Sequence, residues 1–138
     1  MFSSHSTGMP ALDARDDFAR ARRAHLAART LRWLRRRPAC LRTLPATAPR
    51  GAARAAVIPL SAIVGTVEPS PHFDARFRPV SPHLRARWVR VALAHRTGVS
   101  LPPIAVLQGC DGYYVLDGRH RVSVALAAGL REIEAYVA

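Results

Sequence analysis

The sequence contains no lysine. All 21 of its basic residues are arginines, they face only nine aspartates and glutamates, and the formal net charge is +12. A chain with this charge attracts phosphates, nucleic acids and other polyanions. The charge is uneven, because residues 1–50 hold 11 arginines and three acids, whereas residues 51–138 hold ten arginines and six acids.

Cysteines and long apolar runs are also scarce. Cys40 and Cys110 form neither a CxxC pair nor a metal-ligand spacing, which argues against a zinc ribbon or a disulfide-stapled secreted domain. The longest apolar stretch, residues 55–67, is interrupted by Pro59 and Gly65 and is too short to cross a bilayer. The N-terminus lacks the apolar core of a signal peptide. We therefore expect a cytoplasmic protein that does not contact a membrane.

Composition divides the chain into four parts. The longest segment without an internal proline or glycine, residues 10–37, is rich in Ala, Leu and Arg and predicts one helix. A stretch rich in Pro, Ala and Gly follows and is typical of a linker. The predicted parts are a disordered N-terminus (1–9), a basic helical arm (10–44), a linker (45–56) and a folded domain (57–138).

The arm carries arginines at regular helical spacing. Leu12, Ala19, Leu26 and Trp33 recur every seven residues and predict a narrow apolar stripe. Because a linker follows the arm, we expect the arm to fold independently and to contact DNA or a partner protein. The arginines expected to contact nucleic acid are Arg22, Arg29, Arg35, Arg36 and Arg37.

Short strand and helix patterns alternate in the folded domain. Apolar residues at helical spacing, Leu84, Trp88 and Val91, predict one buried helix face. The fold class predicted is α+β, a small mixed sheet preceded by a basic N-terminal helix. The predicted elements are a strand and turn (57–67), a loop (68–81), a helix (82–96), a strand (104–107), a hairpin turn (109–112), a strand (113–116), a helix (119–128) and a strand (133–137).

The segment Asp117-Gly118-Arg119-His120-Arg121 has the pattern of a phosphate-binding turn. A glycine between a strand and a helix lets the backbone approach a phosphate closely, and the first N–H groups of the helix point outward. Arg121 can bind phosphate oxygens with both arms of its guanidinium group, and His120 can donate a hydrogen bond. Asp117 could cap the helix or hold Mg²⁺ beside the phosphates.

The segments LPPIAV, GYYVLDGRHRVSVALAAG and IEAYV resemble the ParB/sulfiredoxin-like superfamily. The upstream segments IPLSAIVGT and FDARFRP resemble the opening strand and loop of that fold, so the resemblance covers residues 57–138. It implies a nucleotide site for CTP or ATP, with Mg²⁺, at residues 117–121. Within the FDARFRP loop, Arg76 and Arg78 are expected to reach the triphosphate.

The turn matches three branches of this superfamily differently. In segregation ParB proteins the equivalent turn has the sequence Gly-Glu-Arg-Arg and binds CTP. Gly118 and Arg121 match the first and last residues of that turn. Sulfiredoxins read Gly-Cys-His-Arg and bind ATP, but Arg119 stands in place of their catalytic cysteine, which argues against sulfinic-acid reduction. In free-serine kinases the turn resembles Asp-Gly-His-(Thr or His)-Arg. Glu68 lies where those enzymes have an acidic catalytic residue.

The resemblance implies a ParB-like nucleotide-binding module, acting in chromosome partitioning or transcription regulation. One alternative is a serine-kinase-like phosphotransferase with Glu68 as general base. Another is a non-catalytic protein-interaction domain. Arg119, in place of an acid or a thiol, favours binding without turnover. The residues leave open which nucleotide is bound, which partner the arm contacts, and the oligomeric state.

Overall fold

The structure is a computed structural model that describes residues 6–35, 42–43 and 51–138, without the side chains of residues 32–35. Several sequence-based expectations fall outside this range. They concern the first five residues of the N-terminus, Arg36 and Arg37, the side chain of Arg35, and residues 45–50 of the linker.

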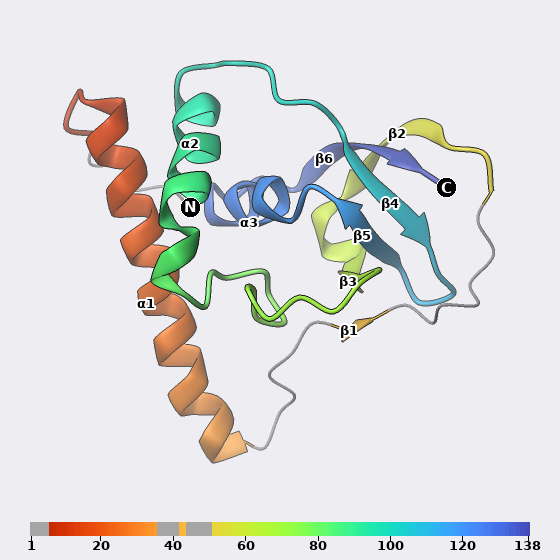
Figure 1. The fold of residues 1–138 in the computed structure, drawn as a ribbon, viewed down its shortest axis with the longest axis horizontal. Coiled ribbons are helices and arrows are strands. Elements are labelled where there is room, and N and C mark those ends of the chain that lie inside the picture. Colours follow the sequence, from red (N-terminus) through yellow and green to blue (C-terminus); the bar gives the residue numbers. More distant parts are fainter. Residues whose placement is uncertain (1–5, 36–41, 44–50) are drawn as a thin grey trace.

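Three α-helices, two short 3₁₀ helices and six strands make up the described chain (Figure 1). The predicted fold class, α+β with a small mixed sheet preceded by a basic helix, is confirmed. In chain order the elements are α1 (Pro10–Arg35), β1 (Arg42–Thr43), β2 (Arg54–Pro59), η1 (Leu60–Ala62), β3 (Ile63–Thr66), η2 (Pro82–Leu84), α2 (Arg85–Arg96), β4 (Ile104–Gln108), β5 (Tyr113–Asp117), α3 (Arg119–Ala127) and β6 (Glu132–Val137).

The six strands form one mixed sheet in the order β1-β3-β5-β4-β6-β2. Strands β4 and β5 are antiparallel neighbours joined by the predicted hairpin, in which the Gly109 N–H donates to the Gly112 carbonyl at 2.8 Å. Strand β5 lies parallel to β3, and β4 lies parallel to β6. Helix α3 follows β5 directly, so the central pair of strands positions the start of this helix.

The core lies between one face of the sheet and the helices. Helix α1 runs along α2 on the side away from the sheet (Figure 1). Trp88 of α2 is fully buried, its ring centroid is 5.6 Å from that of Phe18 in α1, and its indole N–H donates to Ser123 of α3 at 2.8 Å. Three helices therefore meet at one tryptophan. Burying aromatic rings of this size is a major contribution to core stability.

The buried face of α1 differs from the predicted stripe. Leu12 and Leu26 are 43% and 46% exposed, whereas Ala14, Phe18 and His25 are buried. The heptad pattern was misleading because seven of the 26 residues of this helix are alanines and seven are arginines, and the spacing of a few larger residues does not fix which side faces a partner. The partner helix decides it, since Phe18 meets Trp88.

Ion pairs join α1 to α2. Asp17 is buried and accepts hydrogen bonds from the Nε and NH2 of Arg96 at 2.6 and 2.9 Å. Asp13 is also buried, and its Oδ2 lies 3.9 Å from the NH1 of Arg96. The N-terminal residues fold back here, because the backbone N–H of Thr7 donates to Asp13 at 3.0 Å. The expectation of an arm that folds independently is therefore corrected by this packing.

The region before the domain also differs from the prediction. Strand β2 begins at Arg54, inside the predicted linker 45–56, and pairs along its length with β6. A second strand, β3, stands where only a turn was predicted after the first strand. Its four residues include Gly65, which weakens any local strand signal. None of the helices in the described ranges is both long and apolar enough to cross a membrane.

We predict that Phe18→Ala lowers the free energy of unfolding by about 3–5 kcal/mol, as truncation of a buried phenylalanine does. The matched control is Leu12→Ala on the exposed side of the same helix, for which a change within about 0.5 kcal/mol is expected. Urea unfolding followed by circular dichroism measures both. If Leu12→Ala lowered the free energy of unfolding more than Phe18→Ala, the apolar stripe that the heptad pattern predicted would be the buried face after all.

Candidate functional site

The turn between β5 and α3 requires a glycine. Gly118 has φ of 107°, a left-handed conformation that L side chains rarely adopt. A Cβ atom at this position would lie 2.5 Å from the Cγ2 of Ile104 in β4. The backbone of the turn is thus pressed against the neighbouring strand, and α3 begins at the next residue, Arg119.

The first turn of α3 is open to a ligand. No side chain from the described residues caps this helix at Gly118. The first N–H groups of a helix have no partner within it, and the helix dipole adds partial positive charge at this end. Such a terminus favours a phosphate or a carboxylate.

Arg121 holds the turn in place. Its NH1 donates to the carbonyl oxygens of Pro102 and Pro103 at 2.5 and 2.8 Å, and its NH2 donates to the Oδ2 of Asp117 at 2.8 Å. The Arg121 side chain is only 15% exposed, whereas that of Asp117 is 72% exposed. Arg121 therefore joins α3 to the segment before β4, and a bound anion would share this guanidinium group with Asp117.

A cavity of about 550 Å³ opens at the turn. It is cationic, because three guanidinium groups line it and Asp117 is the one acidic residue in its wall. The lining polar residues are His72, Arg87, Asp117, Arg119, His120 and Arg121. Phe73, Val91, Leu101, Pro102 and Leu116 contribute apolar surface.

His120 lies in this wall as a neutral group. Burial lowers its pKa from 6.5 to about 4, and the positive charges of Arg87 and Arg119 and the His72 ring add to the effect. Its Nε2 atom is buried and has no hydrogen-bond partner among the described residues. The ring packs edge-on against Phe73, with centroids 5.1 Å apart. A buried polar atom without a partner is costly, and a ligand group in the cavity would satisfy it.

The three other predicted site residues lie in two different places. Glu68 lies beside the turn, where its Oε2 is 3.9 Å from the NH2 of Arg119, although its side chain is 77% exposed. Arg76 and Arg78 are not brought to the turn. They line a different cavity against α1, and Arg78 lies 3.7 Å from Asp74 and donates to the Ala24 carbonyl at 3.4 Å.

The sequence-based prediction missed Arg87 and His72. Arg87 lies three residues after Leu84 and four before Val91, at the margin of the buried face of the second predicted helix. An arginine at such a margin extends from a fixed helix over the neighbouring surface. Its spacing from Leu84 and Val91 could therefore have identified Arg87 as a residue near the buried face. His72 gave none, since it lies in an irregular loop.

The side chains of the site are better suited to bind an anion than to bind a metal ion directly. Its one lining carboxylate, Asp117, is paired with Arg121. Across the described ranges, no group of three or more His, Cys, Asp or Glu side chains is placed to hold a metal. Any Mg²⁺ would therefore have to arrive with the phosphates of a ligand.

Neither a family model nor a curated protein matches this chain. Among solved structures, sulfiredoxin from Arabidopsis thaliana is similar, with a TM-score of 0.40 and 20% sequence identity over 62% of this chain and 84% of that chain.

We predict that the His120 ring titrates with a midpoint near pH 4, measured by NMR on its carbon-bound ring protons. The pKa is lower in the folded than in the unfolded protein, so the unfolded state takes up the proton first. Folding stability should therefore fall as the pH drops from about 6.5 to about 4. This loss should be smaller in His120→Gln. A midpoint at or above 6.5 in the folded protein would contradict the buried neutral ring.

Proposed function

We propose that the protein binds a nucleoside triphosphate through its phosphates, in the cavity at residues 117–121. The observation that carries the proposal is the convergence of Arg87, Arg119 and Arg121 around the uncapped first turn of α3. Guanidinium groups and helix N-terminal N–H groups are the two donor types that proteins use most readily for phosphates.

The side chains have distinct tasks in this proposal. Arg119 and Arg87 bind phosphate oxygens from α3 and α2, while Arg121 keeps the turn closed through its bonds to Pro102 and Pro103. Neutral His120 donates or accepts one hydrogen bond through Nε2. A phosphate beside Arg121 competes with Asp117, which leaves the Asp117 carboxylate available to Mg²⁺ carried by the nucleotide.

CTP and ATP are the two nucleotides that the resemblance implies. A cavity of about 550 Å³ lies within the range of small-molecule and cofactor pockets. The apolar residues in its wall, among them Phe73, Val91 and Leu101, offer surface to a base or a ribose.

A second part of the proposal is that the outer surface of α1 contacts nucleic acid. The supporting observation is the way α1 distributes its charges. Asp13 and Asp17 are buried beside Arg96, whereas Arg15, Arg23 and Arg29 are exposed. Two of the three acids of the helix are thus paired within the fold and only Asp16 is exposed, so the outer surface stays basic. A nucleotide-binding module with such a surface suits chromosome partitioning or transcription regulation.

A phosphotransferase is the alternative that one contact favours. Glu68 lies 3.9 Å from Arg119 and so reaches the edge of the turn. A general base requires a position within hydrogen-bonding distance of the acceptor hydroxyl. In this alternative, Glu68→Gln abolishes phosphate transfer from ATP to serine, while nucleotide binding is retained.

We predict that Arg119→Ala and Arg87→Ala each weaken ATP or CTP binding by about 10-fold to 100-fold, because each removes a charge-assisted hydrogen bond worth about 1.5–3 kcal/mol. Calorimetric titration with Mg²⁺ present measures the affinities. The matched control is Arg90→Ala, which removes the same charge from an exposed position on α2. Equal affinity in the wild type and both site variants, with unchanged circular dichroism, would refute the phosphate site.

We predict that Arg23→Ala combined with Arg29→Ala weakens DNA binding and makes it less salt-dependent; Arg22, which the sequence also suggested, is only partly exposed. The plot of log affinity against log salt has a negative slope, and each lost phosphate contact should make that slope less steep by about 0.9. Fluorescence anisotropy with a labelled duplex measures this slope at several salt concentrations. The control, Arg54→Ala combined with Arg131→Ala, removes the same charge from exposed positions outside α1. A slope lowered equally by both pairs would show that net charge, and not α1, is responsible.

A further inference from the structure

A second cavity, of about 300 Å³, lies between α1, the loop of residues 74–78 and α3. It shares no lining residue with the cavity at the phosphate-binding turn. Its wall combines three arginines with an apolar floor.

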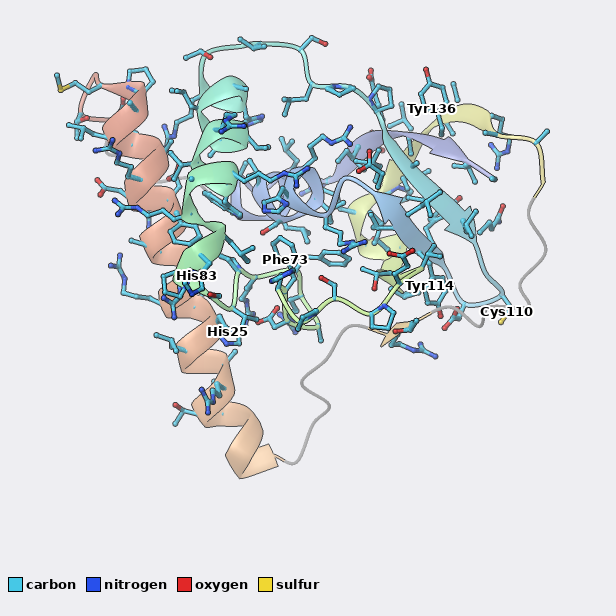
Figure 2. The ribbon with its side chains drawn as sticks, in the orientation of Figure 1. His25, Phe73, His83, Cys110, Tyr114 and Tyr136 are labelled. Carbon is cyan, nitrogen blue, oxygen red and sulfur yellow. The ribbon has the colours of Figure 1, made fainter. Side chains whose placement is uncertain are left out.

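The loop in this wall is held rigidly by Asp74, which is buried. One of its carboxylate oxygens accepts the backbone N–H groups of Arg76 and Arg78, both at 2.9 Å, and the other lies 3.0 Å from the Nδ1 of His25 in α1. Between the two arginines, Phe77 adopts φ of 58°, in the left-handed region. Bulky residues rarely adopt it, and such strain concentrates at functional sites. His25 extends from α1 toward the loop that carries Phe73 (Figure 2).

The floor of the cavity is apolar and lined by small side chains. Ala21 and Ala24 come from α1, Leu126 and Ala127 come from α3, and Phe77 closes the base. Protein interiors are close-packed, and a hollow persists here because small alanine side chains line it. Its volume is at the lower end of the range for small-molecule pockets, which points to a small ligand.

Positive charge exceeds negative charge around this floor. The carboxylate of Asp17 is already bound by Arg96 through two hydrogen bonds. Arg76 is exposed and makes no side-chain hydrogen bond or ion pair within the described residues, and Arg20 has one contact, with Asp17 at 3.3 Å. At least one guanidinium group at the opening is therefore available to a further anion.

We infer that this cavity binds a small aliphatic carboxylate. The carboxylate is bound by the guanidinium groups of Arg76 and Arg20, whose planar geometry matches two carboxylate oxygens. The alkyl chain lies over Ala21, Ala24 and Ala127 and is removed from water. This cavity shares no lining residue with the phosphate site, so the inference does not depend on that site.

Calorimetric titration of the full chain with acetate, butanoate and hexanoate tests the inference. Affinity should rise about fourfold for each added methylene, since burying one contributes about 0.8 kcal/mol. Hexan-1-ol, which has the same chain without the charge, should bind about 10-fold to 100-fold more weakly. No saturable binding of hexanoate at millimolar concentrations would overturn the inference, as would equal affinity for hexanoate and hexan-1-ol.

Two variants locate the binding. Arg76→Gln should weaken hexanoate binding about tenfold or more, whereas the control Arg90→Gln, with the same loss of charge on α2, should leave it unchanged. Ala127→Leu fills the floor and should abolish binding. Because Arg76 is exposed, its variant tests the site even if Ala127→Leu fails to fold. Hexanoate affinity that is unchanged in Arg76→Gln would place the binding elsewhere and overturn the inference.

The hydrogen bond between Trp88 and Ser123 provides an independent signal, since Ser123 lines the cavity. The sequence has two tryptophans, so Trp33→Phe leaves Trp88 as the single tryptophan, which is excited at wavelengths that tyrosine does not absorb. Hexanoate should change its emission with the same midpoint as the calorimetric titration. An emission that stays constant through saturation would show that the ligand occupies another place and would overturn the inference.

Discussion

The hydrogen bonds of Arg121 determine the shape of the turn on which the proposed function depends. One guanidinium group joins the start of α3, the Asp117 carboxylate at the end of β5, and the two proline carbonyls before β4. Gly118 makes this arrangement sterically feasible, because any side chain there would collide with Ile104. The open end of α3 is thereby held at the edge of the sheet, facing a cavity with Arg87 and Arg119 in its wall. A preorganised site of this kind loses little conformational entropy when it binds an anion.

In α1, two of the acidic side chains are buried, whereas most of the described arginine side chains are at least partly exposed. The two buried aspartates of α1 pair with Arg96 and so join α1 to α2. His25 of α1 contacts Asp74 and so joins α1 to the loop of residues 74–78. Breaking a buried pair of this kind typically costs about 3–5 kcal/mol, so α1 is part of the domain and not an appendage. The exposed arginines are left without equal numbers of exposed acids. The same ion pairs thus fasten the helix and leave its outer surface basic.

Local sequence signals predicted much of the fold. The β4–β5 hairpin, Gly118, α3 and the long α1 follow from short-range chemistry, namely turn glycines, helix propensity and strand alternation. What depends on contacts distant in sequence was missed. The buried side of α1 is set by Trp88, 70 residues beyond Phe18, and β3 is a strand because it pairs with β5. Arg87 joins the site only because α2 packs over α3.

The central claim is that phosphate oxygens bind at the first turn of α3. The most direct measurement is a two-dimensional ¹H–¹⁵N NMR titration of the ¹⁵N-labelled full chain with Mg²⁺ and ATP, then CTP. The account predicts that the backbone N–H signals of Arg119, His120 and Arg121 show the largest shifts and saturate together. Shifts confined to the arginines of α1, or none at residues 118–121, would contradict it.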